Sequence, residues 1–166
     1  QAESGRLTHL VSPNGEYLAA FDAGRLVALH TLAGTAGRTS TAPSPLPFKY
    51  DTEYCEPVAL SDDGATLAVS CSENERAHHV SVTRLTAPSR PPVSLPFPHP
   101  VSATAFDPAG KRLVVALENR SLRAFDLHTA NGGEPVSAFA GRADDVNDLQ
   151  FNRAGTMLAS SSYDGT

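Results

Sequence analysis

Residues 105–116 read AFDPAGKRLVVA, and related stretches occur at three other places in the chain. The counterparts are LVSPNGEYLAAF at 10–21, ALSDDGATLAVS at 59–70 and QFNRAGTMLASS at 150–161. In each copy a glycine follows an apolar residue by four positions and precedes a leucine by three. The glycines are Gly15, Gly64, Gly110 and Gly155, so the successive spacings are 49, 46 and 45 residues. A recurring pattern whose phase never changes indicates a structural repeat.

Each copy has the pattern of two short strands joined by a tight turn. The glycine tolerates the positive φ that such turns need, and turn-forming residues surround it between two apolar runs. In the third copy, strands are predicted at 113–117 and 121–127, on either side of a turn at Glu118 to Arg120. A weaker fourth strand is predicted at 136–139, after the turn at Asn131 to Gly133. No segment sustains a period of 3.6, so we expect no helix of consequence.

Repeat length and strand count together predict an all-β fold built from four-stranded antiparallel units. A period of roughly 40 to 45 residues is typical of one blade of a β-propeller. We treat residues 1–166 as one propeller segment, with blades at about 5–50, 51–97, 98–140 and 141–166 and the last one truncated. Propellers have roughly four to eight blades, so about three and a half would make an incomplete ring. We expect a continuation of the chain to supply the rest; another chain or a second copy are the alternatives.

Two segments carry a resemblance to a known family. NRSLRAFDL, at 119–127, places Phe125 and Asp126 where WD repeats (Trp-Asp repeats) of β-propellers have Trp and Asp. DDVNDLQFNRAGTMLASSSYDGT, at 144–166, resembles the first two strands of that repeat and its final turn, which contains Asp164. The chain is similar to the WD-repeat family over nearly all of its length, most closely in the last repeat.

The sequence departs from the family pattern at three places. Gly141-Arg142 stands where the family has Gly-His, the chain has no tryptophan, and SENERAHH at 72–79 reads as a lengthened turn in the second blade. The family's buried network of His, Ser, Asp and Trp therefore cannot form in full. A partial version is expected from Asp164 with Ser160 or Ser162.

The resemblance implies a rigid, non-catalytic platform for protein interaction or sensing, without a cofactor. Family members bind through the face where two kinds of connection converge: the segment before the first strand, and the turn between the second and third strands. The residues expected to contact a partner are Arg142 and Asp145 before the last blade, with Glu118 and Tyr163 in the turns. Their mix of charge and one aromatic ring suits a protein or peptide partner.

A catalytic propeller, lactonase-like or hydrolase-associated, is the alternative. It needs Glu, His, Asn or Asp side chains converging on the central channel, and no motif in the sequence assembles them. The serines at 160–162 lack the G-x-S-x-G nucleophile elbow. We therefore predict no enzymatic activity.

No metal site is predicted either. His78 and His79 are adjacent, and neighbouring residues on a strand point to opposite faces, so they are poorly placed to share a metal. The pair Asp62-Asp63 occupies the same place in its repeat as Pro108-Ala109, which favours a turn over a carboxylate site.

Charge and composition set the remaining expectations. With a formal charge of −5 and no basic cluster among 13 Lys and Arg, the chain is not expected to bind nucleic acid. No apolar run reaches the roughly 18 to 20 residues of a membrane span, and the first residues lack the features of a signal peptide, so we predict a cytoplasmic location away from membranes. Cys55 and Cys71 fit no zinc or redox spacing, so buried thiols are expected, with a disulfide as the alternative.

Two proline-rich stretches lie between blades, TAPSPLPF at 41–48 and APSRPPVSLPFPHP at 87–100. Proline favours extended backbone and is tolerated on edge strands, so each stretch is predicted to be a stiff connector that includes an outermost strand. The alternative is a docking segment for an aromatic-lined groove.

Overall fold

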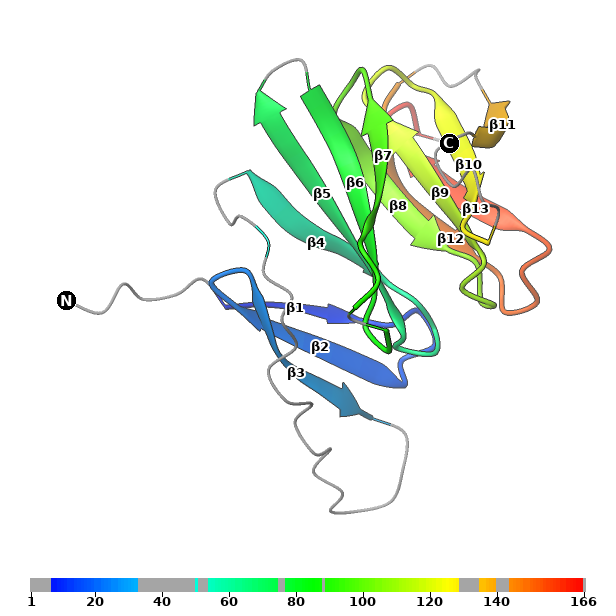
Figure 1. Cartoon of the computed structure of the whole chain (residues 1–166). Coiled ribbons are helices and arrows are strands. Elements are labelled where there is room, and N and C mark those ends of the chain that lie inside the picture. The colour runs from blue at the N-terminus through cyan, green and yellow to red at the C-terminus, as the bar shows by residue number, and fades with distance from the viewer. Residues whose placement is uncertain are drawn as a thin grey trace.

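The structure, a computed structural model, describes residues 7–32, 50, 54–74, 77–87, 89–128, 135–139 and 144–165. The regular secondary structure in these ranges consists of β-strands. The strands form four separate antiparallel sheets that follow one another in chain order, from blue to red in Figure 1, without closing into a ring. The predicted all-β fold is therefore confirmed. No helix in the described ranges is long and apolar enough to cross a membrane.

We refer to the sheets as blades 1 to 4. Blade 1 contains β1 (Leu7–Val11), β2 (Tyr17–Asp22) and β3 (Arg25–Thr31). Blade 2 contains β4 (Cys55–Leu60), β5 (Thr66–Asn74), β6 (Ala77–Arg84) and β7 (Val93–Phe97). Blade 3 contains β8 (Val101–Phe106), β9 (Arg112–Leu117), β10 (Leu122–Asp126) and β11 (Pro135–Phe139). Blade 4 contains β12 (Val146–Phe151) and β13 (Leu158–Ser162).

The outer strands of blades 2 and 3 lie where the sequence predicts them. β11 confirms the weak fourth strand of the third copy, and β7 confirms an outermost strand within the second proline-rich stretch. The first proline-rich stretch lies outside the described residues. The lengthened turn predicted at 72–79 is wrong, because β5 and β6 extend as paired strands as far as Asn74 and Ala77. The extra residues lengthen the hairpin instead of its loop.

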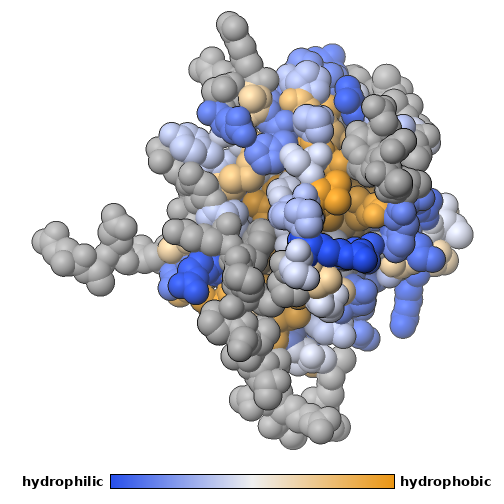
Figure 2. All heavy atoms as spheres, viewed as in Figure 1, coloured by the Kyte–Doolittle hydropathy of each residue, from blue (hydrophilic) through white to orange (hydrophobic). Residues whose placement is uncertain are grey.

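Apolar clusters between successive blades hold the sheets together. Because alternate residues of a strand point to opposite faces, each blade turns one face to the preceding blade and the other to the next. We call these the leading face and the trailing face. The cluster between blades 2 and 3 contains Ala68, Val80, Val82, Leu95, Phe97, Phe106, Leu113, Val115, Leu117 and Phe125. In the space-filling view, hydrophilic side chains surround apolar ones that remain visible over blades 2 and 3 (Figure 2).

The repeated leucine belongs to the leading face. Leu67 packs in the cluster between blades 1 and 2, and Leu113 in the cluster between blades 2 and 3, and both are fully buried. The ring of Phe125, at the predicted Trp position, meets the ring of Phe97 edge to face at a centroid distance of 5.7 Å. The pattern that identifies the repeat therefore also builds the contacts between blades.

The turn between the first two strands has the same backbone in all four blades. Its glycine has a φ of +72° at Gly15, +67° at Gly64, +63° at Gly110 and +67° at Gly155. Each glycine N–H donates to the carbonyl three residues earlier, over 2.8 to 2.9 Å. Since side chains other than glycine rarely adopt such a φ, the backbone explains why the sequence repeats glycine here.

Side chains complete this turn in two different ways. In blade 2, Ser61 Oγ accepts the N–H of Thr66 and donates to Asp63 Oδ1, and Ser12 and Asn14 repeat this arrangement in blade 1. In blade 3, Asp107 Oδ1 accepts two backbone N–H groups directly, as Asn152 does in blade 4. Asp63 is thus a turn residue, as predicted.

Each later turn glycine lies against a side chain of the preceding blade. A Cβ placed on Gly64 would lie 2.6 Å from Tyr17 Cδ1. The same test gives 3.6 Å from Gly110 to Ser61 Cβ, and 3.2 Å from Gly155 to Pro108 Cδ. For a Cβ placed on Gly15, no heavy atom of the described residues outside its chain neighbours lies within 4 Å. The turn glycine therefore has two roles. It adopts the positive φ of the turn, and it leaves room for a side chain of the preceding blade, a contact that we call seating.

Cys55 and Cys71 form a disulfide, so the prediction of two buried thiols is wrong. The two residues lie directly opposite each other on β4 and β5, with Cα atoms 4.0 Å apart. Spacing motifs gave no sign of this pairing, because hairpin register brings the two sulfurs together. In blade 3 the equivalent pair is Val101 and Leu117, so the disulfide replaces an apolar contact.

Reduction is expected to destabilise the chain. The disulfide spans 16 residues, and a cross-link of about that length contributes about 3 kcal/mol. The melting temperature should therefore fall by roughly 6 to 12 °C in reductant. The variant Cys55→Val/Cys71→Leu, which copies the pair of blade 3, should melt at the same temperature with and without reductant. A native chain that is insensitive to reductant would contradict the disulfide.

Gly64→Ala should destabilise the chain more than Gly15→Ala. Both substitutions put a side chain at positive φ, which costs about 1 kcal/mol or more. Only Gly64→Ala also displaces the Tyr17 ring, so we expect it to lower the free energy of unfolding by at least about twice as much. Urea unfolding of dilute protein measures both losses. Equal losses would show that Tyr17 does not seat on Gly64.

Candidate functional site

The first strands of the blades form the inner wall of the arc. β1, β4, β8 and β12 lie next to one another in that order. Each ends at a repeated turn, so the four turns gather at one end of the wall, which we call the turn end. The end at which these strands begin is called the opposite end.

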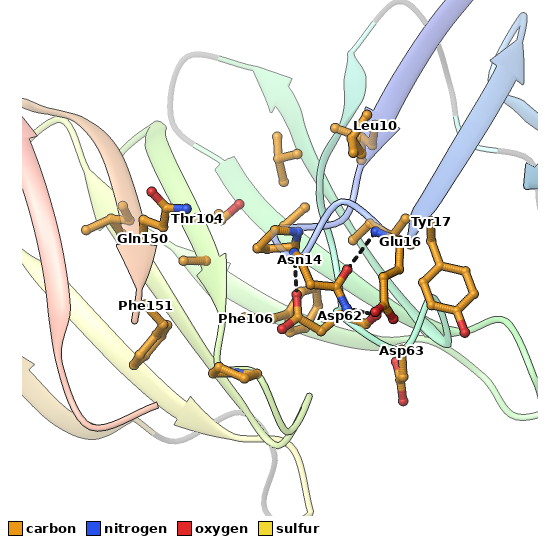
Figure 3. Close-up of a pocket in the computed structure, with 18 of the residues that line it drawn as sticks. Leu10, Asn14, Glu16, Tyr17, Asp62, Asp63, Thr104, Phe106, Gln150 and Phe151 are labelled. Atoms are coloured by element: carbon orange, nitrogen blue, oxygen red, sulfur yellow. Dashed lines mark hydrogen bonds between the residues drawn. The ribbon is translucent and has the colours of Figure 1, made fainter. Parts of the chain in front are cut away.

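A hollow of about 890 Å³ lies on the inner wall at the turn end. Leu10 lines it from β1, Thr104 and Phe106 from β8, and Gln150 and Phe151 from β12, as Figure 3 shows. Its apolar wall also includes Val58, Leu60 and Leu149, and its polar rim carries Asn14, Glu16, Asp62, Asp63 and Arg153. The hollow combines an apolar floor with charged groups at its margin.

Hydrogen bonds at the turn end join one blade to the next, and two of the rim residues, Asn14 and Asp62, take part in them. The Asn14 N–H donates to Asp62 Oδ1 and its Nδ2 donates to the Asp62 carbonyl, each over 3.0 Å, so the turns of blades 1 and 2 are tied together (Figure 3). Arg112 Nη2 donates to the Gly155 carbonyl over 3.0 Å, and its Nε forms an ion pair with Asp107 at 3.1 Å. These polar groups therefore stabilise the turns and the contacts between neighbouring blades.

Three of the four predicted partner-contacting residues lie at the opposite end. Glu118 follows β9, and its N–H donates over 3.0 Å to the carbonyl of Pro100, which precedes β8. Asp145 precedes β12, and the exposed Tyr163 follows β13, whose last residue pairs with the first of β12. Arg142 lies outside the described residues. Topology thus brings Glu118, Asp145 and Tyr163 to one end, away from the larger hollow.

A second hollow, of about 200 Å³, lies on the inner wall at the opposite end. Its lining includes the carboxylates of Glu56 and Asp148, the amide of Asn147 and the hydroxyls of Ser102 and Thr104. The Ser102 Oγ and Thr104 Oγ1 atoms are buried and have no hydrogen-bond partner among the described residues. The second hollow is therefore lined by two acids and by two hydroxyls that have no hydrogen-bond partner among the described residues.

Sequence reasoning missed the residues of the second hollow. The available signal was a polar residue directly after the first apolar residue of the inner strand, at Glu56, Ser102 and Asn147. β8 and β12 both carry a bulge at this position, between Val101 and Ala103 and between Val146 and Asp148. Ser102 and Asn147 are therefore taken out of regular strand pairing, whereas Glu56 pairs with Ser70 of β5.

Asp126 and Asp164, which the family resemblance points to, form local hydrogen bonds within their own blades. Asp126 Oδ1 accepts the N–H of His128 over 2.8 Å, and the Asp164 N–H donates to Ser162 Oγ over 3.3 Å. The partial network predicted around Asp164 stays a prediction. Ser160 lies on β13 within blade 4.

The two adjacent histidines differ in burial. His78 is buried, with Nδ1 2.9 Å from Ser72 Oγ and Nε2 unpartnered among the described residues. His79 is half-buried. In the part of the chain that the structure describes, no group of three or more His, Cys, Asp or Glu is placed to hold a metal ion.

Comparison with known proteins bears on the last repeat. The family model described as "WD domain, G-beta repeat" matches residues 133–166. No curated protein matches the chain. The match covers blade 4, the repeat in which the resemblance was closest, and the four unclosed antiparallel sheets fit part of a β-propeller. Residues 133–166 are thus similar to a WD repeat, and they stand within an all-β arrangement that fits part of a propeller.

Proposed function

We propose that the chain is a non-catalytic scaffold that binds a protein or peptide partner at the opposite end of its inner wall. WD repeats generally serve in protein interaction. The observation that carries this proposal is the second hollow, whose lining combines Glu56 and Asp148 with two buried hydroxyls that have no hydrogen-bond partner among the described residues. Glu118 and Asp145 add carboxylates at the same end.

The chemistry of this end favours a basic segment. Carboxylates and hydroxyl oxygens both accept hydrogen bonds from an ammonium or guanidinium group. The chain carries a formal charge of −5, which would also attract a basic partner during diffusion. Tyr163 offers an exposed ring for packing or a cation–π contact. We therefore propose that a lysine or arginine side chain of the partner enters the second hollow.

The catalytic alternative would use the same hollow, since Glu56, Asn147 and Asp148 are residue types that such a site needs. The scaffold proposal is preferred because WD repeats are typically interaction platforms. The cytoplasmic location stays a prediction, and the Cys55–Cys71 disulfide weighs against it, because structural disulfides persist mainly in oxidising compartments.

The test is fluorescence anisotropy with a labelled peptide of alternating lysine and glycine. We expect the peptide to bind, and to bind more weakly as salt is added, because the contacts are between exposed charges. Glu56→Gln should weaken binding roughly 5-fold, corresponding to about 1 kcal/mol for one such pair.

The matched control is Glu16→Gln, which removes the same charge at the turn end. It should change the dissociation constant less than about twofold, because distant exposed charges are screened. Equal effects of the two variants would contradict a site at the opposite end. Equally tight binding of a glutamate–glycine peptide would contradict a basic partner.

A further inference from the structure

The leading face of blade 1 exposes apolar residues at positions that other blades bury. Val11 corresponds in the repeat to Leu60 and Phe106, and it is 49% exposed whereas they are 2% and 3% exposed. Leu7 occupies the place that Cys55 has in blade 2, and it is 74% exposed. The face has the side chains of a blade interface without a blade against it among the described residues.

The trailing face of blade 4 carries the other half of the same interface. Ala159 and Ser161 occupy the repeat positions of Ala68 and Ser70, which lie on the trailing face of blade 2. The residue types are identical at both positions, yet Ala68 is buried against blade 3 whereas Ala159 and Ser161 are exposed.

The turn end repeats this complementarity. Tyr17, which seats on Gly64, corresponds in the repeat to Met157, which is 66% exposed. A Cβ placed on Gly15 would have none of the described residues of another blade within 4 Å. Blade 4 therefore exposes a side chain at the repeat position that Tyr17 uses in blade 1, and blade 1 carries a turn glycine with no side chain of another blade against it among the described residues.

We propose that these two faces bind each other in neighbouring copies of the chain. The trailing face of blade 4 in one copy packs against the leading face of blade 1 in the next, with Met157 against Gly15. This contact continues the interface that already joins blades 1 to 2, 2 to 3 and 3 to 4. Because the two surfaces differ, the association is head-to-tail, and it closes with two copies if the rotation between copies is a half turn.

A second copy is the occupant that the described residues favour, because one chain carries both halves of the interface. Apolar area would be buried on both sides, as it is between blades 2 and 3. The inference goes beyond the proposed function, since the contact uses the two end faces and leaves the second hollow untouched.

The experiment measures molar mass by light scattering over a wide range of protein concentration. The chain should exceed its monomer mass of 17.4 kDa as concentration rises. Val11→Asp puts a charge on the leading face of blade 1, and Ala159→Arg puts one on the trailing face of blade 4. Each variant alone then lacks one half of the interface and should stay monomeric. Mixing the two variants should produce dimers and nothing larger, because each partner then contributes its one intact face.

Val93→Asp is the control for apolar-to-charged substitution. Val93 is 38% exposed on the outer strand β7, away from both end faces, so this variant should associate like the native chain. Circular dichroism melts establish that each variant is folded, and recovery of dimers in the mixture shows that neither single variant failed through misfolding.

Three results would overturn the proposal. The native chain could remain monomeric at every concentration, which would leave the two faces to a blade supplied by other sequence. Association could persist in both variants, which would place the contact elsewhere. The mixture of variants could stay monomeric, which would exclude this head-to-tail pairing.

Discussion

The architecture depends on the seating of each blade on the one before it. At the turn end, a glycine with positive φ leaves room for a side chain of the preceding blade, most closely where Tyr17 meets Gly64. Any Cβ there would collide with the ring and strain the backbone at once. Behind this contact, the leucine three residues later buries against the preceding blade, so one short motif fixes both the hairpin and the packing of neighbouring sheets.

This constraint divides the inner wall into two chemically different ends. At the turn end, polar groups form hydrogen bonds that join neighbouring blades, and they belong to Asn14, Asp62 and Arg112. At the opposite end, bulges release polar residues from strand pairing, and two buried hydroxyls lack partners among the described residues. This difference is the reason for proposing the smaller hollow, and not the larger one, as the binding site.

The fold could be predicted from the sequence because the turn glycine and the following leucine obey local rules that survive in every copy. Even the weak strand at β11 followed from turn residues and an apolar run. The Cys55–Cys71 disulfide could not, because its geometry arises from cross-strand register and not from spacing along the chain. The long β5–β6 hairpin could not be predicted, because polar residues at 72–79 have no intrinsic turn requirement that separates a loop from an exposed strand end.

The candidate site was predictable only in part, for a related reason. Family resemblance pointed to Glu118, Asp145 and Tyr163, and hairpin topology does bring them to one end. Glu56 and Asp148 come from different blades, so no local pattern links them before the inner strands are placed side by side. The bulges at Ser102 and Asn147 depend on pairing with the next strand, which sequence periodicity does not report.

The most direct measurement is a nuclear Overhauser spectrum of the chain in solution. If each blade seats on the turn glycine of the next, cross-peaks must join the ring protons of Tyr17 to the Hα protons of Gly64, and the Hδ protons of Pro108 to the Hα protons of Gly155. Both pairs come from the contacts seen at those glycines. A folded, β-rich chain that lacks these cross-peaks would contradict the stacking of blades on which the whole account depends.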